Sequence, residues 1–332
     1  MKDFAGKIAF ITGGASGAGF GQAQIFSEAG MKVVIADIRQ DHLDEALAYF
    51  KEKGAPVHAI KLDVTDRAAF AAAADEVEKV YGGPPDLLVL TAGVNVFGPA
   101  EASTYDDYDW VVGVCFGGVV NGLVTFVPRM IKAKKGGYIA ATSSWGAFNA
   151  GSMTAPYTAA KAAVLSLMES YYVSLKPYGI GVSVLCPANI KSRIYEAAIK
   201  NRPEHLKNTG YNVNEETQKF LASIHEYGMD PRELAVWLKQ GIENEQFLIV
   251  PYSSGPRMVE LALRRFVDYA SPEGMKRLEE RQKQPPTEEE LQHMAEREGY
   301  DPRTGPRFMN SDVGFAKARK DLDWVDPGKK AK

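Results

Sequence analysis

Cysteine and histidine are scarce in this sequence, and their positions argue against disulfide or metal chemistry. The 332 residues include two cysteines, Cys115 and Cys186, which lie far apart and each in an apolar run. We interpret them as buried thiols in a reducing compartment. The histidines show neither metal-ligand nor catalytic-triad spacing, so we expect no metal site. We interpret all five as surface or lid residues: His42, His58, His205, His225 and His293.

A charge excess and a long hydrophobic run are also absent. Lys and Arg number 39 against 42 Asp and Glu, without a basic stripe, so we expect neither nucleic acid nor a membrane as a partner. The longest weakly charged stretch, residues 111–127, is shorter than the roughly 20 apolar residues of a spanning helix. We predict a buried or interface helix there, whose four glycines allow close approach by a second subunit of a homodimer or homotetramer. The first residues lack a secretory pattern, which predicts a cytoplasmic protein. The remaining partner classes are a small molecule or another protein.

Short β-branched runs alternate with helical patterns along the first 250 residues. This alternation is typical of a parallel sheet, and several runs without polar alternation indicate that helices cover both faces. We predict an α/β, doubly wound (Rossmann) sheet of seven strands, at residues 7–12, 32–37, 57–63, 87–91, 138–143, 182–186 and 247–250. Helix-like composition lies at residues 19–29, 40–53, 68–81, 105–131 and 157–176.

Two further segments flank the last predicted strand. Residues 190–230 mix polar and aromatic side chains, and we interpret them as a substrate lid on a catalytic domain of residues 1–252. Residues 253–332 form a mostly helical C-terminal extension: residues 256–270 have amphipathic spacing, Ser271-Pro272 starts a second helix, and Thr287 with Glu290 forms a capping box for a third. We expect a loop at residues 301–306 and a disordered tail at residues 328–332.

The first strand runs into Thr12-Gly13-Gly14-Ala15-Ser16-Gly17-Ala18-Gly19, a glycine-rich turn that opens a helix. Such glycines let backbone N–H groups approach a pyrophosphate at the positive end of the helix dipole. The spacing is neither GxGxxG nor a P-loop, so this turn alone is equally typical of a structural turn. Asp37, which ends the second strand, favours a nucleotide because its carboxylate can accept hydrogen bonds from a ribose and repels a 2′-phosphate. We therefore expect NAD rather than NADP, with Arg39 partly offsetting the repulsion; otherwise Asp37 is a turn carboxylate.

A tyrosine and a lysine four residues apart share one face of a helix, and Tyr157 with Lys161 is one of three such pairs. Only Tyr157 has a hydroxyl, Ser144, thirteen residues before it; the other two tyrosines, Tyr49 and Tyr172, have alanine there. An ammonium beside a phenol favours the phenolate and lowers the phenol's pKa. The three residues therefore predict a proton-transfer site in which Ser144 holds a carbonyl or alcohol oxygen.

These motifs, in their order and spacing, resemble the short-chain dehydrogenase/reductase family over residues 5–252: the glycine-rich turn, Asp37, Asp63-Val64, Ala92-Gly93, Ser144, Tyr157 with Lys161, and Cys186-Pro187. The resemblance implies cofactor contacts from Asp63 and Val64 at the adenine, Ala92 and Gly93 along the cofactor, and Pro187, Ile190 and Ser192 at the nicotinamide end. It also implies that Tyr157 is the acid/base, that Lys161 binds the nicotinamide ribose, and that Ser144 donates to the substrate oxygen.

The sequence departs from the family's pattern at two places. Leu90-Thr91-Ala92-Gly93 stands where the family has an Asn-Asn-Ala-Gly motif, and we expect Thr91 to loosen a turn that stabilises the sheet. Cys115 stands where the family has a catalytic Asn that shapes its helix and helps to hold a water of the proton relay. We hypothesise that the main-chain carbonyl of Cys115 preserves a weakened relay.

A narrower resemblance concerns the substrate. Residues 1–4, the turn extended to residue 23, residues 125–131 and residues 187–192 are similar to the Cα-dehydrogenases of bacterial lignin aryl-ether breakdown, which oxidise a benzylic alcohol with NAD. Our leading hypothesis is hydride transfer between NAD and a bulky secondary alcohol or ketone. Candidate pocket residues are Val94, Asn95, Phe97, Trp145 and Tyr195. The rival hypothesis, motivated by Cys115, is a catalytically weakened cofactor-binding protein that acts as a sensor or assembly subunit.

Overall fold

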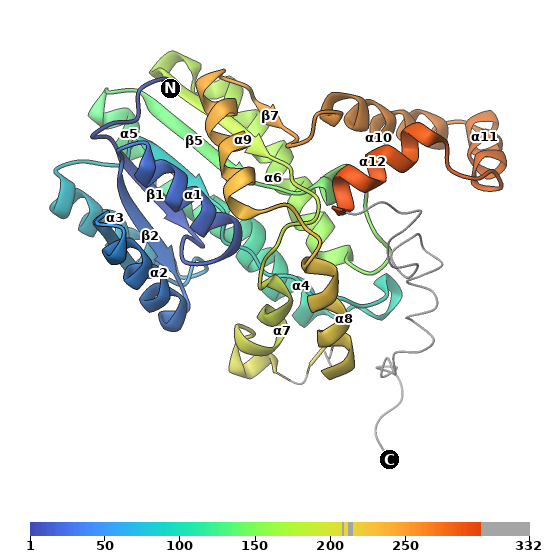
Figure 1. Cartoon of the computed structure of the whole chain (residues 1–332), viewed down its shortest axis with the longest axis horizontal. Coiled ribbons are helices and arrows are strands. Elements are labelled where there is room, and N and C mark those ends of the chain that lie inside the picture. Colours follow the sequence, from blue (N-terminus) through green and yellow to red (C-terminus); the bar gives the residue numbers. More distant parts are fainter. Residues whose placement is uncertain (208, 212–214, 300–332) are drawn as a thin grey trace.

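Seven parallel strands form one sheet in the order β3-β2-β1-β4-β5-β6-β7 (Figure 1). This is a computed structural model of the chain, and it describes residues 1–207, 209–211 and 215–299. The strands are β1 (Ile8–Thr12), β2 (Lys32–Asp37), β3 (Val57–Lys61), β4 (Leu87–Leu90), β5 (Gly137–Thr142), β6 (Ile180–Leu185) and β7 (Leu248–Ile249). Every neighbouring pair is parallel, so the predicted doubly wound sheet is confirmed. The order of strands reverses between β1 and β4, where sheets of this kind bind ligands.

Six helices pack against the sheet, and α4 (Tyr105–Val112) packs against one of them, α6. The six are α1 (Gly17–Glu28), α2 (Gln40–Glu52), α3 (Arg67–Tyr81), α5 (Gly118–Ala133), α6 (Ala155–Ser174) and α9 (Pro231–Glu243). All five helical stretches predicted before residue 180 are helices in the structure: α1, α2, α3, α4 with α5, and α6. α9 lay outside the predicted helices, although Asp230 caps it by accepting a hydrogen bond from Arg232 N and Pro231 occupies its first turn. A parallel connection from β6 to β7 needs such a crossover helix.

Alternate residues of each strand enter two separate hydrophobic cores. In β1, Ile8 and Phe10 belong to the core beneath α3, α5 and α6, whereas Ala9 and Ile11 belong to the core beneath α1, α2 and α9. Successive side chains of a strand point to opposite faces of the sheet. An apolar run without polar alternation therefore buries both faces, as the sequence indicates.

A π-helical turn, Gly113–Gly117, joins α4 and α5 into one continuous helix from residue 105 to 133. Within the described part of the chain, this is the one helix long and apolar enough to cross a membrane by length and composition, but core helices of soluble proteins pass the same test. Leu123, Phe126 and Met130 of α5 are buried against the sheet. The predicted buried helix is therefore confirmed.

The segment predicted as a lid contains α7 (Ala197–Lys200) and α8 (Glu215–His225). A buried ion pair fastens its first half to α4: Arg202 Nη2 lies 3.0 Å from Asp107 Oδ1, with 3% and 0% of the two side chains exposed. The backbone N–H of Tyr211 also donates to Asp107 Oδ1, over 3.1 Å, and its phenol donates to the carbonyl of Pro99. That residues 190–230 act as a lid stays a prediction.

The C-terminal arm, residues 255–299, consists of α10 (Gly255–Tyr269), α11 (Pro272–Gln282) and α12 (Glu288–Glu298). Figure 1 shows α10 leaving the body of the protein, α11 at the far end and α12 returning. Both predicted helix starts are confirmed, because Ser271 accepts from Gly274 N and Thr287 forms a capping box with Glu290. The predicted loop at residues 301–306 and the predicted tail lie outside the described residues, and the boundary at residue 252 stays a prediction.

Candidate active site

The glycine-rich turn connects β1 to α1 and leaves no room for side chains. A Cβ on Gly13, whose φ is +66°, would lie 2.9 Å from Ala92 Cα, and one on Gly19 would collide with the carbonyl oxygen of Gly13. Gly17 also has positive φ, at +49°. Gly13, Gly17 and Gly19 also line a cavity, so a ligand at the N-terminus of α1 can approach their backbone, as a pyrophosphate requires.

Asp37 closes one end of the same cavity. Its carboxylate is 9% exposed and accepts hydrogen bonds from the backbone N–H of Arg39, at 3.1 Å, and of Ala15, at 3.4 Å. Burial raises the pKa of Asp37, and these hydrogen bonds oppose the rise. The Arg39 guanidinium pairs with Asp41 and lies 3.4 Å from Glu196 in the lid segment. Arg39 is thus already held by two carboxylates.

Thr91 stabilises the turn after β4. Its hydroxyl donates to Gln22 Oε1 of α1 and shares a hydrogen bond with Thr142 Oγ1 at the end of β5, both over 2.8 Å. Its backbone N–H, like that of Ala92, donates to Thr12 Oγ1. The expectation that Thr91 loosens this turn is wrong, because one hydroxyl ties β4 to both a neighbouring strand and a helix.

Tyr157 and Lys161 lie on the first two turns of α6. Lys161 is 3% exposed; its Nζ donates to the carbonyl of Thr142 over 2.8 Å and lies 5.5 Å from the centre of the Tyr157 ring. Burial raises the pKa of the Tyr157 phenol, whereas the Lys161 ammonium and a hydrogen bond with Ser144 lower it. Lys161 acts in the predicted direction, but burial has the larger effect on this pKa.

Cys115 lies in the π-helical turn and is fully buried. Its Sγ donates to the carbonyl of Val94 at 3.1 Å and accepts from the N–H of Val94 at 3.3 Å. Burial raises the pKa of the thiol, and the charge of Lys161 opposes this. The neutral thiol therefore fastens the segment after β4 to the long helix, next to Lys161. π-Bulges are frequent at functional sites.

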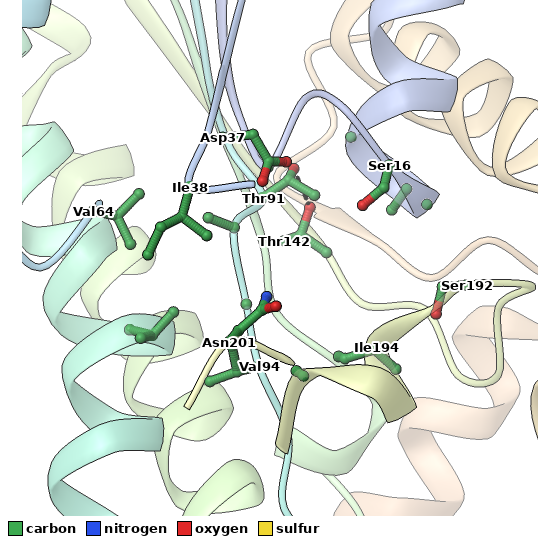
Figure 2. Close-up of a pocket in the computed structure, with 18 of the residues that line it drawn as sticks. Ser16, Asp37, Ile38, Val64, Thr91, Val94, Thr142, Ser192, Ile194 and Asn201 are labelled. Carbon is green, nitrogen blue, oxygen red and sulfur yellow. Dashed lines mark hydrogen bonds between the residues drawn. The ribbon is translucent and has the colours of Figure 1, made fainter. Parts of the chain in front are cut away.

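Most of the predicted cofactor residues line this cavity, and Figure 2 shows ten of the lining residues by name. Those at the wall are Gly13, Ser16, Gly17, Gly19, Asp37, Asp63, Val64, Ala92, Gly93, Tyr157, Lys161, Pro187, Ile190 and Ser192. Thr12 and Ser144 are not among the lining residues: Thr12 is buried and accepts from the turn after β4, and the half-buried Ser144 accepts from Gly146 N at 3.0 Å. The predicted residues are thus gathered around one cavity.

The predicted substrate residues are placed differently. Asn95 and Trp145 are each 8% exposed and lie outside the cavity lining, with Trp145 packed on Phe148 at 5.8 Å between ring centres. Tyr195 stacks on His225 in the lid segment, 5.7 Å between ring centres. Their roles as substrate contacts stay predictions.

The sequence alone did not identify several side chains at the substrate end of the cavity. Apart from Val94, which was among the candidates, the wall there includes Trp110, Val114, Ile194, Ala197 and Asn201. Asn201 is among the lining residues labelled in Figure 2, and its Oδ1 is buried without a hydrogen-bond partner. The sequence signal for Trp110 was its place among apolar residues of the helix predicted at residues 105–131. In the described ranges no group of three His, Cys, Asp or Glu side chains is arranged to hold a metal ion.

Comparisons with known proteins identify relatives that are dehydrogenases. The family model for short chain dehydrogenase matches residues 7–203. The chain is 50% identical over 272 residues to a C alpha-dehydrogenase from Sphingobium sp. strain SYK-6. The aligned region covers 82% of this chain and 89% of that protein.

Solved structures give the same picture. The apo form of LigD from Sphingobium sp. strain SYK-6 is 43% identical, with a TM-score of 0.68, over 81% of this chain and 100% of that one. A short chain dehydrogenase/reductase from Burkholderia phymatum in complex with NAD is 30% identical, with a TM-score of 0.73, over 81% of this chain and 96% of that one.

Proposed function

The chain belongs to the short chain dehydrogenase family, and we propose that it transfers a hydride between NAD and a bulky, benzylic secondary alcohol or the corresponding ketone. The observation that carries this proposal is the placement of Tyr157 and Lys161 at the wall of a cavity that begins at the glycine-rich turn. The substrate class rests on the 50% identity to a C alpha-dehydrogenase.

The cofactor-binding residues fit a nicotinamide dinucleotide. The open backbone of Gly13, Gly17 and Gly19 suits the pyrophosphate, and the buried Asp37 carboxylate suits a ribose with free hydroxyls. When bound, the cofactor accepts or supplies the hydride. Because Arg39 is already paired with Asp41 and Glu196, it is poorly placed to neutralise a 2′-phosphate, which favours NAD over NADP.

In the oxidation direction, the Tyr157 phenolate removes the proton of the substrate hydroxyl. Lys161 stabilises this phenolate through its charge, and its hydrogen bond to the carbonyl of Thr142 fixes its Nζ in place. Ser144, which helps to lower the pKa of Tyr157, orients the substrate oxygen. In reduction the same phenol returns the proton.

The substrate end of the cavity favours an aromatic alcohol. Val94, Trp110, Val114 and Ile194 supply apolar and aromatic surface, and pockets of this kind bind bulky apolar groups with a few polar contacts for orientation. We expect wild-type protein with NAD to oxidise benzylic alcohols faster than steroidal or sugar alcohols. Absorbance at the reduced-nicotinamide band measures this, and turnover only with sugar alcohols would contradict the benzylic class.

A catalytically weakened sensor or assembly subunit is not favoured. The relatives named above are dehydrogenases, and the Cys115 thiol keeps two hydrogen bonds to Val94. NAD binding without reduction of the cofactor by any alcohol would support that alternative. The homodimeric or homotetrameric state and the cytoplasmic location stay predictions; light scattering of the purified protein tests the first.

Asp37 is expected to set the cofactor preference. An Asp37→Ala variant loses the carboxylate that would bind the ribose, so kcat/KM with NAD should fall about 10- to 100-fold. Activity with NADP should rise relative to NAD because the repulsion of the 2′-phosphate is removed. Asp44→Ala, which removes an exposed aspartate of α2, is the matched control and should change kcat/KM with either cofactor little. Equal losses with both cofactors in Asp37→Ala would refute this assignment.

Cys115→Asn is expected to raise kcat if the proton relay limits turnover. An amide is a stronger donor and acceptor than a thiol, so it should hold Val94 more firmly and restore the family's usual side chain at this point of the helix. Cys186→Ser replaces the thiol of the other buried cysteine and controls for the loss of any buried thiol. An unchanged or lower kcat, with NAD affinity intact, would reject a limiting relay at Cys115.

A further inference from the structure

We propose that the C-terminal arm belongs to the catalytic unit, because α10 and α12 hold the loops after β5 and β6, with Arg265 as the principal positioning residue. The inference rests on the proposed function, since these loops carry Ser144 and the cavity wall at Pro187. The loop after β6 approaches the glycine-rich turn, where Ser192 lies next to Gly17. Arg265 holds the other loop, the one after β5, so its loss should affect the reacting groups more than NAD binding.

Arg265 connects α10 to the loop after β5. Its Nη2 donates to the carbonyl of Phe148 at 2.6 Å, and its Nη1 donates to the Asn149 side-chain oxygen. The guanidinium also lies over the Phe266 ring, 5.1 Å from its centre. Two donors of one planar group thus fix the backbone at Phe148 and the side chain at Asn149, which a flexible ammonium cannot do together.

The same loop positions Ser144. Phe148 packs on Trp145, the residue that follows Ser144, and the N–H of Trp145 donates to the carbonyl of Pro187 over 2.7 Å. Met258, from α10, is buried in the core that contains Trp145 and Phe148. A shift of Phe148 would therefore be passed to Ser144 through one tightly packed turn.

α12 holds the loop after β6. The N–H of Asn189 donates to the carbonyl of Arg297 at 3.3 Å, and the Glu296 carboxylate accepts from the hydroxyls of Ser253 and Ser254. On the other side of this loop, the N–H of Ala188 donates to the Tyr252 phenol at 2.9 Å. Ala188 lines the cavity, so the end of α12 lies one residue from its wall.

Close backbone packing continues this contact into the cavity wall. A Cβ on Gly299, which ends α12 with φ of +81°, would collide with the carbonyl of Tyr227. A Cβ on Gly228 would in turn collide with the backbone of Ile190, which lines the cavity. Ile190 and Met229 also form a parallel β-bridge. The arm, residues 227–229 and the wall are therefore stacked without intervening side chains.

Arg265→Ala tests the inference in the full-length protein. We expect kcat/KM for the alcohol to fall about 10- to 100-fold, the usual effect of losing hydrogen bonds to a charged group, with the Kd for NAD unchanged. Arg265→Lys should recover part of the loss, because one ammonium can still reach one of the two acceptors. Arg264→Ala, the exposed neighbour, is the matched control and should behave as wild type.

Glu296→Ala tests the α12 contact independently. It should also lower kcat/KM, whereas Glu279→Ala, which changes an exposed glutamate of α11, should not. Wild-type kcat/KM in both Arg265→Ala and Glu296→Ala would overturn the proposal. Loss of NAD binding in proportion to activity in Arg265→Ala would overturn it as well, because that pattern marks general destabilisation.

A failure of the proposed function is distinguishable from a failure of this inference. If the wild-type protein oxidises no alcohol, the proposed function is refuted. The positioning role of Arg265 can then still be tested by amide hydrogen exchange. Arg265→Ala should speed amide exchange at residues 145–149 and leave residues 13–19 unchanged. Unchanged exchange at residues 145–149 would overturn the positioning role, whatever the substrate.

Discussion

A Tyr157→Phe variant is expected to turn over its alcohol about 10²- to 10⁴-fold more slowly than wild type, the range that one general acid/base contributes. Phenylalanine keeps the ring against its neighbours and removes only the hydroxyl that moves the proton. The Kd for NAD should change little, because the glycine-rich turn and Asp37 are untouched. Stopped-flow absorbance and a fluorescence titration measure the two quantities.

The chain supplies its own control for this variant. Tyr172 lies on the same helix, also has a lysine four residues later, and its ring lies 4.5 Å from the Lys176 ammonium. It has no hydroxyl at the position that Ser144 occupies relative to Tyr157. Tyr172→Phe should keep wild-type turnover. Equal turnover in Tyr157→Phe and wild type would refute the mechanism.

The pH dependence of kcat/KM provides a second test of Tyr157, because its direction can be predicted. Burial raises the pKa of Tyr157, and oxidation needs the phenolate, so kcat/KM for oxidation should rise as pH increases above neutrality. Lys161 opposes the effect of burial, so Lys161→Met should move the rise to higher pH. A profile that falls with rising pH would contradict a phenolate base.

An Asp107→Asn variant is expected to lose about 3–5 kcal/mol of unfolding free energy, as when one partner of a buried ion pair is removed. The Arg202 guanidinium is 3% exposed and would remain buried without a counter-charge. Asp107 also accepts hydrogen bonds from Tyr211 N and from Thr104, so the anchor of the lid segment on α4 would weaken. Urea unfolding measures the loss.

An exposed pair provides the comparison for Asp107. Glu28 and Arg232 are 55% and 42% exposed and 2.8 Å apart, and Glu28→Gln should cost about 0–1 kcal/mol. Adding Arg202→Met to Asp107→Asn should recover part of the lost stability, because the uncompensated charge is gone. Equal losses for Glu28→Gln and Asp107→Asn would show that burial of this pair has little energetic effect.

The sheet could be predicted from the sequence because its signals are local. Short apolar, β-branched runs such as residues 32–37 identify strands from the local sequence alone. The glycine-rich turn and Asp37 mark where the chain leaves β1 and β2. Tyr157 and Lys161 were predictable because four residues on a helix define a shared face. Their spacing needed no knowledge of distant parts of the chain.

What the sequence could not supply are contacts between segments far apart. Asp107 and Arg202 are separated by 95 residues, and each looks like a surface charge until the lid segment packs on α4. The roles of Thr91 and Arg265 depend in the same way on partners in other elements. Asn95 and Trp145 are residue types that often line pockets, but tertiary packing decides how deeply each is buried. The sequence therefore could not predict that both lie outside the cavity lining.

The π-helical turn at Gly113–Gly117 determines the helical phase between α4 and α5. A π-bulge amounts to one extra residue in an α-helix, and one residue rotates the following turns by about 100° about the axis. α5 packs on the sheet, while Asp107 and Trp110 on α4 are directed toward the lid segment and the cavity. Deleting one residue within this turn would rotate both side chains away from the lid segment and the cavity while α5 stays on the sheet.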